Sequence, residues 1–146
     1  MTQVSEEKKT LKIALLGCGS VGSQVARLLR EQAADLAVRT GAQLELAGIA
    51  VRRPQHRRDA AIDRSLLTAD AMELATRPDI DIVVEVIGGI EPARSLLLAA
   101  MKAGKSVVTA NKALLAEDGA VIHGAAREHG TDLYYEAAVA GRGTWL

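Results

Sequence analysis

Residues 12–22 read Lys-Ile-Ala-Leu-Leu-Gly-Cys-Gly-Ser-Val-Gly, and this stretch decides the fold. Its first five residues form a compact apolar run that is typical of a buried strand. Gly17, Gly19 and Gly22 then form the pattern Gly-x-Gly-x-x-Gly where a helical pattern begins. The first glycine permits a tight turn, the second lets the backbone approach a pyrophosphate, and the third lets helix and strand pack closely. The stretch predicts a dinucleotide-binding loop, although a glycine turn that only packs a helix on a strand would read the same way.

The rest of the chain alternates between short apolar runs and longer helical patterns. The patterns predict strands at 12–16, 44–51, 80–87, 106–109 and 132–135, and helices at 21–39, 66–76, 92–103 and 118–129. Thr68 is the expected N-cap of the second helix. This alternation predicts an α/β fold, a doubly wound parallel sheet of the Rossmann-like, nucleotide-binding kind with strand order 3-2-1-4-5. Segments 17–22, 51–53, 87–90 and 109–112 would then meet at the carboxyl ends of the strands.

The length of 146 residues fits one domain of ordinary size. We expect a disordered leader at 1–10, a dinucleotide-binding domain at 11–141 and an atypical tail at 142–146. The formal net charge is zero, which disfavours a nucleic-acid partner. No apolar run approaches the length of a membrane helix, and the single cysteine, Cys18, favours a reducing compartment, so we expect a cytoplasmic protein. His56, His123 and His129 have no metal-like spacing and receive no role.

The end of the second predicted strand bears on the choice of dinucleotide. An NAD-selective site usually carries Asp or Glu there, to bind the ribose 2′-hydroxyl. This chain instead reads Val51-Arg52-Arg53-Pro54. Because a guanidinium suits a 2′-phosphate, Arg52 and Arg53 favour NADP(H) over NAD(H). The alternative is a solvated basic loop whose charge is balanced by nearby carboxylates.

Three later segments make the interpretation more specific. They are residues 79–89, Asp-Ile-Asp-Ile-Val-Val-Glu-Val-Ile-Gly-Gly; residues 107–116, Val-Val-Thr-Ala-Asn-Lys-Ala-Leu-Leu-Ala; and residues 135–141, Tyr-Glu-Ala-Ala-Val-Ala-Gly. Together with the glycine loop, they resemble the nucleotide-binding domain of the homoserine dehydrogenase family. The resemblance runs from about residue 12 to residue 141. It implies an enzyme, an NAD(P)-dependent oxidoreductase that interconverts homoserine and aspartate 4-semialdehyde on the pathway to threonine, isoleucine and methionine.

The resemblance also assigns roles to individual residues. Ser20 and Val21 belong to the phosphate loop with its three glycines. Gly88 and Gly89 would line the cofactor near the nicotinamide ribose, and Thr109 and Asn111 would lie beside the nicotinamide. Lys112 would sit by the reacting oxygen of the substrate and help to move its proton. The residues alone agree on the location of Lys112, at the edge of the crevice, but they would equally fit a surface lysine at a helix start.

Two glutamates have separate interpretations. Glu85 lies inside the most apolar strand, where a carboxylate needs partners. We expect it to bind backbone N–H groups near the loop ends rather than to act in catalysis. Glu136 and Val139 match a family loop that binds a monovalent cation, Na⁺ or K⁺, largely through backbone carbonyls.

The tail departs from the family pattern after Gly141, where the chain reads Arg-Gly-Thr-Trp-Leu. The family would continue into a substrate domain that also supplies the homodimer interface. We therefore expect a chain that is inactive alone, with an exposed sheet edge that favours association. Two alternatives remain: a nucleotide-binding module or remnant without chemistry, and another reductase on the same fold, such as one acting on sugars or dihydrodipicolinate.

Overall fold

A parallel sheet organises the chain. The computed structural model describes residues 9–17, 19–31, 34, 38, 41–54 and 62–135. The strands are β1 (Lys9–Leu16), β2 (Ala42–Ala50), β3 (Leu67–Thr68), β4 (Ile82–Glu85), β5 (Ser106–Thr109) and β6 (Leu133–Tyr135). The helices are α1 (Ser20–Glu31), the 3-10 turn η1 (Arg64–Leu66), α3 (Ala71–Thr76), α4 (Ala93–Lys102) and α5 (Lys112–His129). Within the described ranges the strand order is β3-β2-β1-β4-β5-β6, and every pairing is parallel.

The doubly wound architecture and an order that begins 3-2-1-4-5 are confirmed, with β6 beside β5. All five predicted strands are present, the last of them as β6, and the additional strand is β3, which the sequence did not predict. One element was predicted wrongly. Residues 66–76 do not form a single helix, because β3 pairs with the end of β2 before α3 begins. Asp70, not Thr68, caps α3, since its carboxylate accepts the Glu73 N–H at 3.0 Å. The Thr68 hydroxyl instead accepts the Asp70 N–H.

The predicted strand 80–87 is shorter in the structure, as β4 (Ile82–Glu85), and two elements begin at least three residues earlier than predicted. β1 begins at Lys9, because Lys9 and Thr10 pair with the start of β2, so the last two residues of the predicted leader are strand. Helix α5 begins six residues earlier than predicted. Asn111 caps it by accepting the Leu114 N–H, and the predicted start, Asp118, is a kink with non-helical φ and ψ. The predicted leader and tail otherwise lie outside the described residues.

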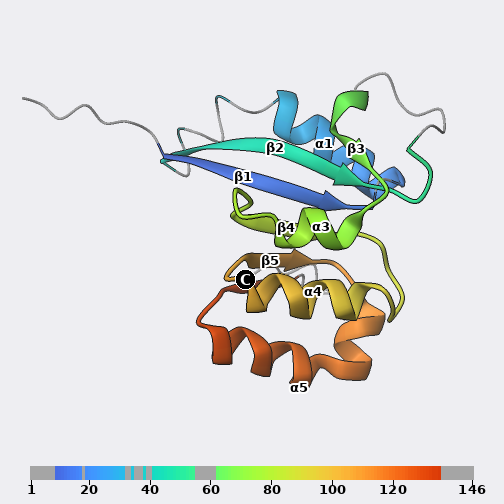
Figure 1. Cartoon of the computed structure of the whole chain (residues 1–146), viewed down its shortest axis with the longest axis vertical. Helices are drawn as coiled ribbons and strands as arrows, with labels where there is room; N and C mark the ends of the chain where they lie inside the picture. The colour runs from blue at the N-terminus through green and yellow to red at the C-terminus, as the bar shows by residue number, and fades with distance from the viewer. Residues whose placement is uncertain are drawn as a thin grey trace, which may run out of the picture.

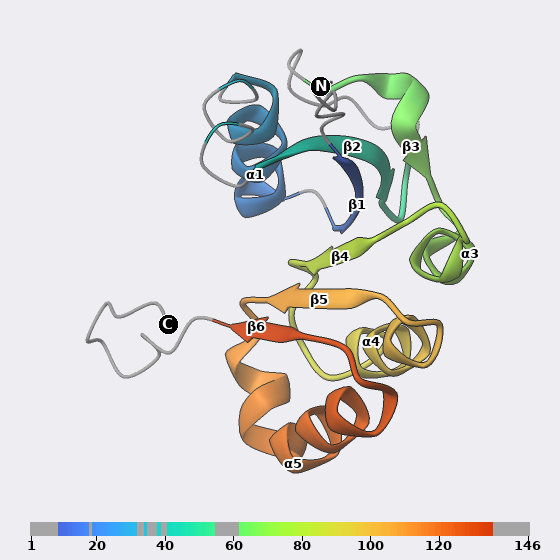
Figure 2. The ribbon, with the colours of Figure 1, turned by 90° about the vertical axis from the view of Figure 1, so that its left-hand side faces the viewer.

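Helices cover both faces of the sheet. Figure 2 shows α1 on one face and α3 with α4 on the other, while α5 packs against α4. The side chains of β1 divide accordingly: Leu15 joins the cluster under α1, whereas Ala14 and Leu16 join the larger cluster under α3, α4 and α5. Because buried apolar side chains alternate along β1, the strand is fixed in register from both sides. Among the described helices, none has both the length and the apolar character required to cross a membrane.

The strands end at a common edge. Leu16 pairs with Glu85, and Glu85 pairs with Thr109, so the last residues of β1, β4 and β5 lie side by side. Figure 1 shows these strands running in one direction. The loops that follow them therefore gather at the carboxyl end of the sheet, where ligands bind in folds of this architecture.

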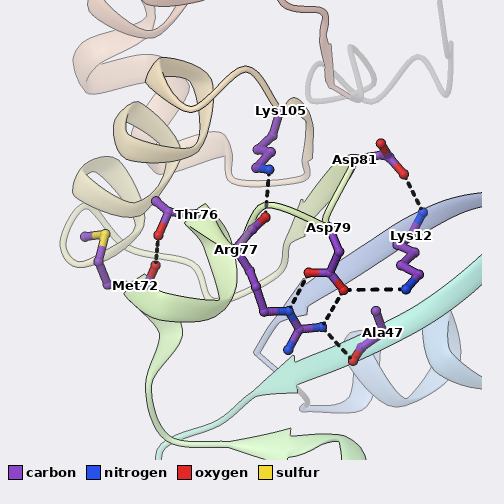
Figure 3. A network of polar contacts seen from close by, with 8 residues as sticks. All are labelled: Lys12, Ala47, Met72, Thr76, Arg77, Asp79, Asp81 and Lys105. Atoms are coloured by element: carbon purple, nitrogen blue, oxygen red, sulfur yellow. Dashed lines mark hydrogen bonds and ion pairs between the residues drawn. The ribbon is translucent and has the colours of Figure 1, made fainter.

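The opposite ends of β4 and β5 carry a network of charged side chains (Figure 3). The Arg77 guanidinium donates to Asp79 at 2.7 Å and to the Ala47 carbonyl oxygen at 3.3 Å. The buried Lys105 ammonium donates to the Arg77 carbonyl oxygen at 2.7 Å. This network joins the loop before β4 to β2 and to the start of β5.

Candidate functional site

The glycine loop after β1 has the geometry that its spacing predicts. Gly17 has φ +99°, and a Cβ atom on it would lie 3.2 Å from the Ile87 backbone nitrogen. A Cβ on Gly22 would lie 2.7 Å from the Gly17 carbonyl oxygen, closer than real side chains approach. A Cβ on Gly19 would meet nothing within 4 Å. The loop is thus closed on its protein side and open at Gly19, which is the shape that a backbone cradle for phosphate requires.

A cavity of about 690 Å³ opens beside this loop. Its walls come from the carboxyl ends of β1, β2 and β4 and from the beginnings of α3 and α4. The lining residues are Gly17, Gly19, Ala50, Val51, Arg52, Arg53, Ala69, Ala71, Val86, Ile87, Gly88, Glu91, Pro92 and Leu96. Pockets of this volume hold small ligands and cofactors. The open glycine loop, the apolar floor and the two arginines fit a nicotinamide dinucleotide.

Behind the cavity wall, Glu85 is fully buried at the end of β4. Its Oε2 accepts the N–H groups of Ile87 at 3.0 Å and Gly88 at 2.9 Å. Its Oε1 accepts a hydrogen bond from the Thr109 hydroxyl. The prediction that Glu85 binds backbone N–H groups near the loop ends is confirmed by this geometry.

Asn111 continues the same network. Its Nδ2 donates to the Gly89 carbonyl oxygen at 2.7 Å and to Glu85 Oε2 at 3.2 Å. Its backbone N–H donates to the Thr109 hydroxyl oxygen at 3.0 Å. Its Oδ1 accepts the Leu114 N–H and so caps the start of α5. Thr109 and Asn111 are almost fully buried, so their polar atoms serve the protein interior. They hold the turn that carries Gly88 and Gly89.

Lys112 is the first residue of α5, and it is exposed. It lines a smaller cavity of about 340 Å³, not the cavity beside the glycine loop. His123 and Tyr135 line the same small cavity, and their rings meet edge to face with centroids 5.4 Å apart. The structure thus separates Lys112 from the predicted phosphate loop while joining it, through Asn111, to the Gly88–Gly89 turn.

Ion pairs fix the start of α4 at the cavity rim. The Glu91 carboxylate accepts hydrogen bonds from the Ser95 N–H and from the Arg94 guanidinium. These two bonds hold the pKa of Glu91 below its ordinary value. Arg94 also donates to Asp118 at the kink of α5. Its bonds to Glu91 and Asp118 raise the pKa of Arg94 above its ordinary value. The guanidinium thus links the two helices near the site.

The structure brings together Gly17, Gly19, Arg52, Arg53 and Gly88 in the larger cavity, as the sequence predicts. Gly22 lies behind the loop as its packing residue. Ser20 and Val21 open α1, and their side chains are not among those described. Glu136 and Val139 lie outside the described residues, so the monovalent-cation site stays a prediction. Within the described ranges, no group of three or more His, Cys, Asp or Glu side chains gathers to hold a metal.

Sequence reasoning missed part of the cavity wall. Ala69 and Ala71 line it because β3 ends at the same edge as β1 and β2, and the sequence interpretation placed them inside a helix. Pro92 and Leu96 line it from the start of α4. The signal for these two was available, since a helix that follows a strand of a parallel sheet begins at the carboxyl edge.

Comparisons with known proteins agree with this geometry. The family model described as "Homoserine dehydrogenase, NAD binding domain" matches residues 17–136. The homoserine dehydrogenase of Corynebacterium glutamicum is 56% identical over 129 residues, which are 88% of this chain and 29% of that protein. The homoserine dehydrogenase of Mycobacterium tuberculosis H37Rv is 52% identical over 135 residues, 92% of this chain and 30% of that protein.

A solved homoserine dehydrogenase from S. aureus superposes with a TM-score of 0.85 and 38% identity, over 91% of this chain and 33% of that chain. The chain thus spans about 30% of the length of the curated relatives that it matches. The matched part is the domain that binds the nicotinamide cofactor in the family model. With its glycine loop and cavity, the chain belongs to the family of homoserine dehydrogenase NAD-binding domains.

Proposed function

We propose that this chain is the cofactor-binding part of an enzyme that interconverts L-homoserine and L-aspartate 4-semialdehyde. The observation that carries the proposal is the cavity of about 690 Å³ at the carboxyl edge, lined by the family's own glycine loop. The relatives over which the chain aligns are named homoserine dehydrogenases, and it covers about 30% of their length. The reaction therefore belongs to a protein longer than the aligned domain.

The nicotinamide, when bound, takes a hydride from the alcohol carbon of homoserine or returns one to the aldehyde carbon of the semialdehyde. Lys112 is the proposed proton carrier of this chain. In oxidation its amine takes the hydroxyl proton as the carbon loses its hydride, and in reduction its ammonium returns a proton to the carbonyl oxygen. Support comes from its position at the start of α5, directly after Asn111, which holds the Gly88–Gly89 turn.

The proposed cofactor is NADP(H), bound in preference to NAD(H). Arg52 and Arg53 are exposed at the cavity, directly after β2. The segment that follows β2, residues 51–54, contains no carboxylate to receive a ribose 2′-hydroxyl. A guanidinium at this position binds a 2′-phosphate with charge-assisted hydrogen bonds. NADP(H) carries this phosphate, and NAD(H) does not.

Isothermal titration calorimetry of the 146-residue chain tests both statements. We expect NADPH to bind at least about ten-fold more tightly than NADH, since a charge-assisted hydrogen bond contributes about 1.5–3 kcal/mol. Arg52→Ala with Arg53→Ala should remove the preference and leave NADH affinity unchanged. Arg127→Ala, an exposed arginine near the end of α5, is the matched control. Equal affinities in the unaltered chain would refute the NADP(H) preference, and no binding of either nucleotide would refute the function.

The chain alone should bind cofactor without turning over homoserine. Hydride transfer needs a substrate held in register with the nicotinamide, and such positioning accounts for about 7–11 kcal/mol of a barrier. A coupled assay of nicotinamide reduction with homoserine should therefore give no rate above background. Na⁺ or K⁺ at Glu136 and Val139, and homodimerisation of the whole enzyme, belong to the same proposal. Cation-dependent NADPH affinity of this chain is the direct test of the cation site.

A further inference from the structure

The cofactor cavity and the start of α5 share one buried residue. Glu85 has no exposed surface, so it touches neither solvent nor a ligand in the cavity. Its two carboxylate oxygens accept from four groups: the Ile87 and Gly88 N–H, the Asn111 Nδ2 and the Thr109 hydroxyl. Every partner is a donor. A carboxylate is the side chain that offers only acceptors, and it can satisfy several donors at once.

One branch of this network shapes the cavity. Ile87 and Gly88 line the cavity, and both of their N–H groups point back to Glu85 Oε2. The third residue of the turn, Gly89, is held by its carbonyl oxygen, which accepts from Asn111. The wall of the cavity at this turn is thus fixed by hydrogen bonds from behind rather than by packing alone.

The other branch reaches α5. The Thr109 hydroxyl accepts the Asn111 backbone N–H, so its own proton is directed to Glu85 Oε1. Asn111 then caps α5 through the Leu114 N–H at 3.0 Å, and Lys112 is the residue after the cap. Both oxygens of Glu85 therefore lead to Asn111, one directly and one through Thr109. This double connection fixes the direction in which α5 leaves the sheet.

We propose that Glu85 is a positioning residue that couples the cofactor wall at Ile87–Gly89 to the start of α5, where Lys112 stands. The inference rests on the proposed function for its cofactor. It extends that function by naming Glu85 as the group that positions the cofactor wall and the start of α5 relative to each other. Nucleotide bound against the turn and the first turn of α5 then adjust as one unit. Hydrogen bonds in a buried network strengthen one another, so losing one member disturbs the others.

Glu85→Gln in the full chain is the primary test. The amide nitrogen would face donors where the carboxylate accepts, so at least one backbone N–H loses its partner. We expect NADPH affinity by calorimetry to fall about ten-fold, the equivalent of ~1.4 kcal/mol. Amide hydrogen exchange followed by NMR should accelerate at Ile87 and Gly88, and also at Leu114, whose N–H donates to Asn111 rather than to Glu85. Glu128→Gln, an exposed glutamate on α5, is the matched control and should change neither measurement.

A second pair of variants keeps the inference testable if Glu85→Gln fails to fold. Thr109→Ser retains the hydroxyl, whereas Thr109→Val removes it at nearly the same size. We expect the serine variant to keep the NADPH affinity and the Leu114 exchange rate, and the valine variant to change both. A merely structural role would lower the melting temperature and leave both unchanged well below the transition, and that result would overturn the coupling.

The design also separates the inference from the function on which it rests. If the unaltered chain binds no nucleotide, the proposed function fails, and the exchange of Leu114 in the Glu85 and Thr109 variants still decides the coupling. If the chain binds NADPH but Leu114 exchange and NADPH affinity are unaffected by Thr109→Val, the function stands and the coupling is wrong.

Discussion

The two ends of the parallel sheet solve different problems with different chemistry. At the carboxyl end, an open glycine loop lies beside a cavity, and the buried acceptor Glu85 holds the Ile87 and Gly88 N–H groups behind the cavity wall. At the amino ends of β4 and β5, Arg77 binds Asp79, and the buried Lys105 ammonium donates to the Arg77 carbonyl oxygen (Figure 3). Charge alone therefore does not mark the site, because ion pairs lie at both ends: Arg77 pairs with Asp79 at the amino end, and Arg94 pairs with Glu91 at the cavity rim.

Gly22 packs behind the glycine loop at the carboxyl end, and replacing it should destabilise the chain more than any other substitution considered. In Gly22→Ala, the added Cβ would lie 2.7 Å from the Gly17 carbonyl oxygen, and Gly17 is itself pressed against residues 86 and 87. The steric cost of about 3 kcal/mol outweighs the gain of about 1 kcal/mol in helix propensity. Chemical denaturation should show a less stable chain, and calorimetry should show lost NADPH binding. A chain as stable as the unaltered one would mean that the loop does not close as described.

Gly19→Ala should weaken NADPH binding at the same loop without lowering the stability of the chain. Its Cβ would meet no protein atom within 4 Å, so the free energy of unfolding should not change. The methyl group would occupy space at which a pyrophosphate approaches the backbone, and NADPH affinity should fall about ten-fold, which is ~1.4 kcal/mol. Unfolding and calorimetry on one preparation measure both quantities. Unaltered NADPH affinity would show that phosphate lies elsewhere.

The sequence predicts most of the carboxyl end because backbone geometry there depends on residue type. The spacing of Gly17, Gly19 and Gly22 indicates a loop between strand and helix, and the alternation of elements indicates the edge at which it lies. What the sequence missed depends on contacts distant in the chain. β3 has only two residues, so no periodicity reveals it, and it exists because β2 offers it a partner. Likewise, α5 begins early because Asn111 caps it. The sequence pattern of residues 109–112 indicates only a loop after a strand, so it does not reveal this cap.

Hydrogen-bond networks between side chains were the feature that the sequence predicted least well. Glu85 was expected to bind N–H groups because a carboxylate inside an apolar strand needs donors. Its connection to Thr109 could not be predicted, since it depends on the register of β4 and β5. The separation of Lys112 from the larger cavity also depends on how α5 leaves the sheet, and single-residue patterns carry no record of that direction.

Lys105→Met should lower stability without affecting the cofactor, which sharpens the contrast between the two ends. Lys105 is 5% exposed, and its ammonium donates to the Arg77 carbonyl oxygen. Methionine keeps the unbranched stem and leaves that carbonyl without this donor, which should cost about 1 kcal/mol. Denaturant unfolding measures the loss. NADPH affinity should remain that of the unaltered chain, and a weaker affinity would mean that the amino end reaches the site.

The smallest expected effect is a pH dependence at Asp79. The hydrogen bond from Arg77 holds the pKa of Asp79 below its ordinary value, with a lesser contribution from Lys12. A carboxyl whose folded pKa is depressed stabilises the fold above its unfolded pKa of about 3.9, and that stability is lost as the pH falls through the folded value. Because Asp79 is 41% exposed, solvent screening limits the contribution to about 0.5 kcal/mol. Asp79→Asn should therefore lower stability slightly at pH 7 and flatten its fall toward acid pH, whereas NADPH affinity at neutral pH stays the same. If Asp79→Asn instead weakened NADPH binding, the two ends of the sheet would not be energetically separate.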